Sequence, residues 1–582
     1  MAEEWKVRGG GFVVGEVDPA DIFTPEEIRP EQKEIAGLAR EFVEKEVFPK
    51  ADEIEKGNLE LTVELLKKMG ELGLLGAEIP EEYGGMGVDM TTAALLMEEY
   101  SRTGSFGVSV GAHTGIGTLP IVYFGNEAQK KAYLPDLATG KRLAAYALTE
   151  PMAGSDALGA RTTARLSEDG RHYLLKGQKQ WITNSGFADV FVVYAKVDGE
   201  KFTAFIVERD WKGLSVGPEV KKMGIKGSST RMLFLDDVPV PAENVLGEVG
   251  KGARIAFTIL DIGRLKLGIG SLGSQREVQK MAASYAKGRE QFGQPIARFP
   301  LIQEKLAFMA AEAYALESAA YRTTGLLDRR LHGLDQGQAT RVIAEFALEC
   351  SALKVFGSEV LGRTVDEAVQ IHGGYGYMEE FPVERAYRDA RINRIFEGTN
   401  EINRLLIVET LVRQAMAGLP VLQAATDALK EAGAALEAAQ GGKASWFPQG
   451  KGDGPAEKLL ALTRGARILG LALAGQAFQK AGQDLEKEQE LVGRLADLIL
   501  YLFAAESAFL RVAKGHEEGL LPAQIFAQEA GWRMARAAQE AVDILGLEKG
   551  WRELALSLAD VPVTDLKGLR RALAEKVLAA AP

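Results

Sequence analysis

The stretch VFVVYAKVDGEKFTAFIV, from Val190 to Val207, contains two apolar runs separated by the pair Asp198-Gly199. Both runs have the length and the β-branched and aromatic content of buried strands, and Asp-Gly is typical of a tight hairpin turn. A third apolar run, Met232 to Leu235, and a second turn pair, Asp169-Gly170, repeat the pattern nearby. The sequence therefore predicts a block of antiparallel strands.

Helical periodicity, with apolar residues three or four positions apart, surrounds this block on both sides. It reaches about Leu137 before the strands and resumes near Gly250, and it continues through an Ala/Leu-rich extension that is broken by a Gly/Pro/Lys-rich stretch. Strands gathered in one block cannot alternate with helices, which excludes a doubly wound parallel sheet. We predict an α+β chain, mainly α, with four domains: 1–140 N-terminal α-helical, 141–248 antiparallel β-barrel or sandwich, 249–417 α-helical bundle and 418–582 helical extension.

Composition narrows the classes of function. The chain has 582 residues, of which 46% are hydrophobic and 26% charged, as in ordinary globular proteins. The formal charge of -12 argues against a nucleic-acid partner, because phosphate binding needs a surplus of lysine and arginine. A single cysteine, Cys350, excludes an intrachain disulfide, and its neighbours predict that it is a core residue. None of the five histidines has a zinc-hydrolase spacing, so no metal is expected.

The N-terminus, MAEEWKVRGG, is acidic and lacks an apolar signal region, and no stretch is long and uncharged enough to cross a bilayer. These features predict a cytoplasmic protein. Trp446 and Phe447, flanked by Lys443 and Lys451, could touch a membrane surface peripherally. The favoured interpretation is an exposed mobile loop, because the apolar content is small.

One carboxylate is placed unusually. In RIFEGTNEINRLL, Glu397 stands between Phe396 and Gly398, and Thr399 is a suitable N-cap for the helix that follows. Glu397 is then outside that helix. It could serve only as a first-turn charge, or it could be a base whose proton affinity Phe396 raises by excluding water. Gly398 would let a substrate approach the backbone closely.

Four other stretches are ambiguous when taken separately: YALTEPMAGSD (146–156), WITN (181–184), REQFG (289–293) and QIHGGYGY (370–377). The first stretch has small and hydroxyl-bearing residues that could bind a polar ring, and the second has a tryptophan at the end of a strand. The third has an arginine that could bind a diphosphate, and the fourth has adjacent glycines that could admit a ligand close to the backbone. Loop, packing, charge and helix-capping roles explain each equally well. GIGSLG, from Gly268 to Gly273, formally matches a dinucleotide fingerprint, but no strand precedes it, so a tightly packed helix face explains it better.

Taken together and in this order, YALTEPMAGSD, WITNSG, REQFG, QIHGGYGYMEEFPVER and RIFEGTNEI resemble the acyl-CoA dehydrogenase family over residues 30 to 415. The resemblance implies a helical domain, a β-domain and a four-helix domain, with FAD held between the latter two and across a homodimer contact. It makes Glu397 the base that removes the α-proton of an acyl-CoA thioester while the β-hydrogen leaves as hydride to the flavin. The base of another branch of the family would fall at Gly263, which cannot act as one.

The resemblance also assigns binding residues. Tyr146, Leu148, Thr149, Trp181 and Thr183 would contact the flavin, and Ser155 would lie near the thioester or the nucleotide. Arg289, Gln291 and Phe292 would reach FAD from the neighbouring subunit. Gln370, Gly373, Gly374, Thr399 and Glu401 would complete the cofactor shell. Asp261 and Arg264 would line the CoA channel, with Gly398 beside the substrate.

The extension after residue 420 resembles that of the very-long-chain members, which are dimeric. We therefore expect a homodimer that oxidises medium to long fatty acyl-CoA and passes electrons to an electron-transfer flavoprotein. A non-catalytic assembly or scaffold protein on the same fold, and an acyl-CoA oxidase, are the alternatives. Within the extension, Leu566, Leu569, Leu573 and Val577 form one apolar stripe, which predicts intramolecular packing.

Overall fold

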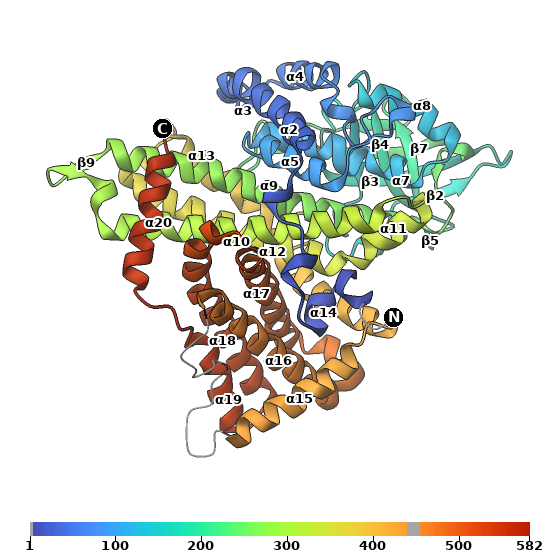
Figure 1. Cartoon of the computed structure of the whole chain (residues 1–582). Coiled ribbons are helices and arrows are strands. Elements are labelled where there is room, and N and C mark those ends of the chain that lie inside the picture. Colours follow the sequence, from blue (N-terminus) through green and yellow to red (C-terminus); the bar gives the residue numbers. More distant parts are fainter. Residues whose placement is uncertain (1–3, 439–445, 447–453) are drawn as a thin grey trace.

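The computed structural model describes residues 4–438, 446 and 454–582. In Figure 1 the N-terminal helices and the β-strands lie together on one side of three long helices, α9 (Gly252–Gly288), α10 (Pro300–Leu331) and α12 (Ala347–His372). Most of the C-terminal extension lies on the other side, while its last helix runs across the long helices. The α+β architecture predicted from the sequence is confirmed.

The first part of the chain is helical, as predicted. Its α-helices are α1 (Gly11–Val14), α2 (Pro30–Phe42), α3 (Ala51–Glu55), α4 (Leu59–Glu71), α5 (Met90–Ser101), α6 (Ser105–Gly111), α7 (Leu119–Phe124) and α8 (Glu127–Ala138). Short π-helical segments follow α2 and α6, at Val43–Val47 and Ala112–Gly117. Such segments are rare and often occur at functional sites.

Eight strands then form one sheet in the order β6-β7-β3-β2-β4-β5-β8, with β1 beside β4. They are β1 (Ala144–Ala147), β2 (Thr163–Leu166), β3 (His172–Thr183), β4 (Val190–Val197), β5 (Lys201–Glu208), β6 (Leu214–Val216), β7 (Thr230–Pro241) and β8 (Val245–Leu246). The two predicted hairpins are present as β2–β3 and β4–β5. Two further pairs, β1–β4 and β2–β4, are parallel, so the sheet is not antiparallel throughout.

Long helices form the centre of the molecule. They are α9 (Gly252–Gly288), α10 (Pro300–Leu331), α12 (Ala347–His372) and α14 (Asn400–Met416), with the shorter α11 (Gln336–Glu345) and α13 (Pro382–Ala390) between them. The predicted small-residue face is confirmed, because a side chain on Gly268 would lie 2.8 Å from the Leu353 carbonyl oxygen of α12. Cys350, also on α12, is 1% exposed and is a core residue, as predicted.

The extension is helical as predicted and consists of α15 (Val421–Ala438), α16 (Pro455–Ala481), α17 (Gln489–Ala513), α18 (Leu520–Leu545), α19 (Lys549–Leu556) and α20 (Leu566–Ala580). The predicted stripe of α20 packs inside the molecule: Leu573 is buried, and Leu566, Leu569 and Val577 are partly buried against the same core. An ion pair between Arg570 and Glu304 joins α20 to α10.

The N-terminal segment, residues 4–28, lies against the extension. Phe12 packs on Phe503 of α17 with ring centroids 4.8 Å apart. Glu506, which is 2% exposed, binds two guanidinium groups, Arg322 of α10 at 2.9 Å and Arg467 of α16. Arg467 also donates to the Phe12 carbonyl oxygen at 2.9 Å. A buried charge triad therefore joins core, extension and N-terminal segment.

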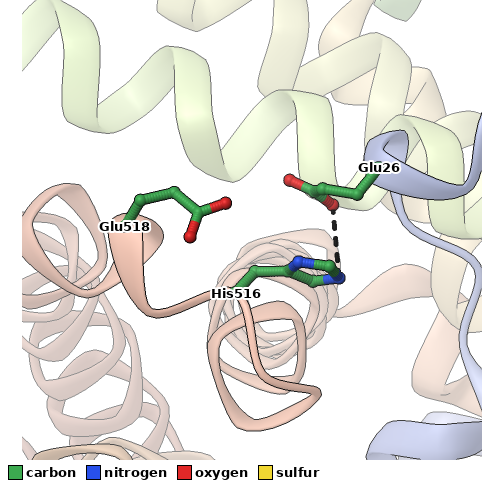
Figure 2. A group of neighbouring side chains, drawn as sticks. All are labelled: Glu26, His516 and Glu518. Carbon is green, nitrogen blue, oxygen red and sulfur yellow. Dashed lines mark ion pairs between the residues drawn. The ribbon is translucent and has the colours of Figure 1, made fainter.

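A second contact between these parts is shown in Figure 2, where Glu26, His516 and Glu518 point toward one another. Their ligand atoms lie within 4.8 Å, and among the described residues this is the single group with that geometry. The Glu26 carboxylate already accepts from Arg511 Nε at 2.9 Å, and His516 Nε2 lies 3.6 Å from it. The group is explained by ion pairing between η3 (Pro25–Glu27) and the end of α17.

The loop proposed as a membrane contact is described only at Trp446. Its indole is half-buried and donates to the Leu554 carbonyl oxygen at 3.1 Å, so the predicted exposure is wrong for this residue. Lys443, Phe447 and Lys451 lie outside the described residues. Within the described ranges no single helix has the length and apolar content of a bilayer span, although by these two measures one pair bent by 108°, α14 with α15, qualifies.

Candidate active site

Glu397 lies on a tight turn that leads into α14. Its φ is 58° and that of Gly398 is 81°, so two successive residues have left-handed backbone. Thr399 caps α14, because its Oγ1 accepts from the Ile402 N–H at 3.3 Å, which confirms the predicted position of Glu397 outside the helix. A glutamate in this conformation is uncommon and is often held at functional sites by its surroundings.

Side chains from three helices hold the turn. Arg264 Nε of α9 donates to the Glu397 carbonyl oxygen at 3.2 Å. Lys354 Nζ of α12 donates to the Gly398 carbonyl oxygen at 2.7 Å, and Asn403 Nδ2 of α14 donates to the same oxygen at 2.8 Å. The unusual backbone is thus fixed by charged and amide donors that converge on two carbonyl groups.

The carboxyl group of Glu397 lies against Gly263 of α9, which has no side chain. A Cβ atom on Gly263 of α9 would lie 2.8 Å from Glu397 Oε2, so only glycine leaves room for the carboxyl group here. Glu397 as a whole is half-buried, but its Oε2 has no contact with solvent and no hydrogen-bond partner among the described residues. Desolvation raises the pKa of Glu397 to about 7, against the opposing effect of the Arg264 and Lys354 cations.

Glu397 and Phe396 line a cavity of about 980 Å³ between the N-terminal helices and α9. One wall is apolar and includes Met97, Val108, Ile116 and Leu267. Three glycines spaced four residues apart, Gly107, Gly111 and Gly115, line it from α6 and the π segment that follows. Residues at this spacing share one helix face. A Cβ atom on Gly107 would lie 2.3 Å from the Tyr100 carbonyl oxygen, so this glycine lets α6 pack closely on α5, while Gly111 and Gly115 place no side chain against the cavity.

Asp261 and Arg264 occupy neighbouring turns of α9 beside this site. Their side chains form a buried ion pair with Arg264 Nη1 2.7 Å from Asp261 Oδ1. Burial raises the pKa of Asp261 to about 6 even though Arg264 opposes the shift. The pair lies at the Glu397 turn, because Arg264 binds both Asp261 and the Glu397 carbonyl oxygen.

The predicted flavin residues of the β-domain approach the same site. Tyr146 of β1 is buried, and its hydroxyl has no partner within hydrogen-bond geometry among the described residues. Burial raises the pKa of Tyr146 well above its usual range, and Tyr194 and the Glu397 charge add to the shift. Thr183 lines the 980 Å³ cavity at the end of β3. Trp181 is 59% exposed with a φ of 57°. Leu148 is buried.

The loop that contains Thr149 and Ser155 is anchored by a buried ion pair that the sequence did not reveal. Lys179 Nζ lies 2.6 Å from Glu150 Oε1, and the Glu150 carboxylate accepts from the Arg161 and Thr162 N–H groups. The Thr149 carbonyl oxygen accepts from the Gln180 N–H at 2.8 Å. Ser155 is exposed on the outer part of this loop.

A second group of predicted residues lies at the far end of α9. Arg289, Gln291, Gly373 and Gly374 line a smaller cavity of about 510 Å³, where the Arg289 guanidinium lies 5.4 Å from the centre of the Tyr375 ring. Side chains added to the two glycines would meet no atom within 4 Å. Gln370 is exposed in the last turn of α12.

Beyond this cavity a short hairpin projects from the molecule (Figure 1). It pairs β9 (Glu290–Gln291) with β10 (Gln294–Pro295), and Phe292 at its tip is 92% exposed. Gly263 and Gly288 are 25 residues apart on α9, which corresponds to about 38 Å of helix. Within one chain, this second group of residues is therefore far from Glu397. Thr399 and Glu401, which is exposed, lie next to Glu397 at the start of α14.

Four acyl-CoA dehydrogenase family models match the chain. The N-terminal domain model covers residues 29–141, the middle domain model 145–238, and two C-terminal domain models 250–412 and 465–551.

Curated relatives and solved structures agree with these models. A probable acyl-CoA dehydrogenase of Bacillus subtilis is 51% identical over 93% of this chain and 92% of its own length. The human very long-chain specific acyl-CoA dehydrogenase is 40% identical over 78% of this chain and 70% of its own. The crystal structure of an acyl-CoA dehydrogenase complexed with FAD from Bacillus anthracis has a TM-score of 0.93 and 51% identity, covering 98% of this chain and 99% of that one. Matched along its length and in its fold, the chain belongs to the acyl-CoA dehydrogenase family and is an FAD-dependent oxidoreductase.

Proposed function

We propose that this enzyme removes two hydrogens from the α and β carbons of medium- to long-chain fatty acyl-CoA, giving the trans-2-enoyl-CoA. The observation that carries the proposal is Glu397 Oε2, a carboxyl oxygen that has no contact with solvent and no hydrogen-bond partner among the described residues and that belongs to a residue lining the 980 Å³ cavity. Such a group is free to take a proton from a bound substrate.

Glu397 suits the chemistry of this step. The α-hydrogen of a thioester is a weak acid, so the base must have a proton affinity well above that of an ordinary carboxylate. Burial supplies this, with a pKa of about 7 that leaves part of the population deprotonated near neutral pH. The Glu397 backbone N–H would donate to the thioester carbonyl oxygen, where negative charge develops.

The described residues fit FAD as the second component. The Tyr146 hydroxyl is a buried polar group without a partner, Thr183 faces the cavity, and Trp181 offers an exposed indole at the end of β3. Leu148, Thr149, Ser155, Thr399 and Glu401 would complete this part of the shell. The bound cofactor accepts the β-hydrogen as hydride.

The remaining cofactor residues point to a homodimer. Arg289, Gln291, Gly373 and Gly374 form their own cavity about 38 Å along α9 from Glu397, and Phe292 projects beyond it. Arginine suits a diphosphate, and an exposed aromatic ring suits stacking on a base. In a dimer this end of one chain would close the cofactor site of the other, with Gln370 alongside.

The size of the 980 Å³ cavity and its apolar wall support an acyl chain of medium to long length as the substrate. The reduced cofactor would pass its electrons to an electron-transfer flavoprotein. A related chain in a structure titled as an electron transferring flavoprotein of Acidaminococcus fermentans has 36% identity and a TM-score of 0.61. The scaffold alternative predicts no turnover, and the oxidase alternative predicts oxygen consumption with acyl-CoA.

Glu397→Gln tests the proposal. The amide keeps the size of the side chain but cannot take the proton, so we expect yellow, FAD-bound protein with turnover reduced by at least about 10³-fold. Anaerobic titration with acyl-CoA of graded length, followed by flavin bleaching, measures both the activity and the chain-length range. Substantial turnover in the variant would refute the role of Glu397, and a wild-type flavin that no acyl-CoA bleaches would refute the function.

A further inference from the structure

Lys354 of α12 is one of the largest side chains that are completely buried in this protein, with 0% exposure. Its ammonium group directs its hydrogen bonds to two neutral oxygens, Gly398 O at 2.7 Å and Asn400 Oδ1 at 2.8 Å. A buried cation bonded to neutral groups is costly, and an apolar side chain of similar size would pack at lower cost. Packing therefore does not explain Lys354.

The two acceptors of Lys354 belong to the turn that carries the proposed base. Gly398 follows Glu397, and Asn400 is the first residue of α14. Asn400 is itself held by α12, because its Nδ2 donates to Ser358 Oγ at 3.1 Å. Lys354 thus joins α12 to both sides of the Thr399 cap and restrains the left-handed backbone at residues 397 and 398.

Lys354 also acts on Glu397 by charge. Its cation lowers the pKa of Glu397, while burial lowers the pKa of Lys354 itself to about 7. The other charged group that faces Glu397 is Arg264 of α9, which is bonded to Asp261. Tyr146 of β1 also lies close. On the side of Lys354, the further charges are those of Arg264, Glu401 and Glu359.

Resting on the role proposed above for Glu397, we propose that Lys354 is a positioning residue that fixes the Glu397–Gly398 turn and places a positive charge beside the base. Lys354 is not among the residues that line the 980 Å³ cavity, and its ammonium group bonds to Gly398 and Asn400, so it acts on the reaction through the turn. It sets where the carboxylate points and the pH range over which the carboxylate is ionised.

Three substitutions separate these two effects. Lys354→Met removes both the charge and the donor, Lys354→Gln keeps an N–H donor without the charge, and Lys354→Arg keeps both. Arg363→Met, on the same helix but paired with Glu312, is the control for loss of a largely buried cation away from the turn. Each protein is tested with FAD bound, as the full chain.

The first readout needs no turnover. Infrared difference spectra against Glu397→Gln follow the protonated carboxyl group of residue 397 as pH is raised. Since the Lys354 cation favours the ionised form, its removal raises the midpoint. We expect Lys354→Met and Lys354→Gln to shift it upward by about 0.5–1.5 pH units, and Lys354→Arg and Arg363→Met to leave it unchanged.

The second readout is the pH profile of kcat/KM with an acyl-CoA, whose acid limb should move with the infrared midpoint. We expect kcat to fall about 10- to 100-fold in Lys354→Met, with a smaller loss in Lys354→Gln and little change in KM. A midpoint that stays at the wild-type value in both uncharged variants overturns the proposal. If Lys354→Met does not fold, the comparison of Lys354→Gln with Lys354→Arg still decides. Absence of wild-type turnover would refute the proposed function and leave the infrared test of Lys354 intact.

Discussion

At the residue scale, the site depends on an absent side chain as much as on those present. Gly263 lies inside α9, where alanine is ordinarily preferred by about 1 kcal/mol. The Glu397 carboxyl group occupies the space that a Cβ atom would fill, at 2.8 Å from Oε2 and 3.1 Å from Cδ. At this position, helix stability favours alanine, whereas the space needed by the Glu397 carboxyl group requires glycine.

The substitution Gly263→Ala tests whether the missing side chain is needed for activity. We expect the added methyl group to push the carboxylate out of line and lower kcat about 10- to 100-fold, because small misplacements of catalytic groups are costly. Gly433→Ala on α15 is the matched control, since its Cβ would meet nothing within 4 Å. It should raise the free energy of unfolding by up to about 1 kcal/mol with unchanged kcat. Equal activity of the two variants would contradict the prediction.

The raised pKa of Glu397 also predicts a pH-dependent stability. Between about pH 4.5 and 7 the folded chain holds a proton on Glu397 that the unfolded chain releases, so this residue costs stability increasingly as pH rises through that window. Glu397→Gln removes the cost. Without FAD, the variant should be more stable than wild type by about 1–3 kcal/mol at pH 8, and the difference should vanish below about pH 4.5. Denaturant titrations at several pH values measure it, and a constant difference would count against the shift.

Individual residues also show which parts of the site could be predicted from the sequence alone. The position of Glu397 before the helix that Thr399 caps could be predicted, because the cap and the start of the helix are close in sequence. Lys354, Asn403 and Lys179 were missed, because a lysine in an apolar helical stretch or a strand has no local signal of its partner. Their acceptors belong to other elements, and only the packing of those elements brings them together.

At the scale of elements, the β9–β10 hairpin has a conformation that its own residues do not favour. Its two turn residues, Phe292 and Gly293, have φ of 53° and 77°, a combination typical of asparagine-glycine turns. A phenylalanine that is 92% exposed in such a turn gains nothing from the chain that carries it, apart from an edge contact to Phe299. This exposure agrees with the proposal that Phe292 contacts the cofactor site of a second chain.

Phe292→Asn therefore should separate local stability from cofactor binding. Asparagine suits the turn, so the cofactor-free chain should unfold at the wild-type temperature or slightly above it. We expect FAD to dissociate at least about tenfold more readily, because an aromatic stacking contact is lost. Fluorescence of released FAD on dilution measures this, and sedimentation of wild type and variant shows whether the proposed dimer forms in each. Unchanged FAD retention would remove the hairpin from the proposed site.

The strands show a similar division between local and distant information. Strands β4 and β5 follow directly from their apolar runs and the Asp198-Gly199 turn. The parallel pairing of β1 with β4 was not foreseen, since Ala144–Ala147 is short and its partner lies more than forty residues away in the sequence. Register between distant strands depends on the assembled core, and local patterns carry no signal for it.

At the scale of the whole molecule, buried ion pairs connect the central helices, the C-terminal extension and the N-terminal segment. Glu506 forms ion pairs with both Arg322 of α10 and Arg467 of α16, and the N-terminal segment lies over this group through Phe12. The four-part organisation could be predicted from changes in periodicity. The return of the N-terminal segment onto the extension could not, because residues 4–28 show no pattern that names their partner.

Glu506→Gln tests how much this triad contributes. Two guanidinium groups would lose their shared carboxylate in a dry environment, so we expect the free energy of unfolding to fall by about 3–5 kcal/mol. Glu16→Gln is the control at the same interface, where Glu16 and Arg464 are 59% and 48% exposed. It should cost less than about 1 kcal/mol. Denaturant unfolding followed by tryptophan fluorescence compares them, and similar losses would argue against the triad.

The burial of Cys350 gives this protein a useful property for spectroscopy. Its thiol is the only one in the sequence, it is 1% exposed, and burial raises its pKa far above the usual range, so maleimide reagents should ignore the native chain. A cysteine introduced at an exposed position such as 292 would then carry a dye or spin label alone. Such a probe would test the proposed dimer by reporting the meeting of two chains in real time, without interference from a second thiol.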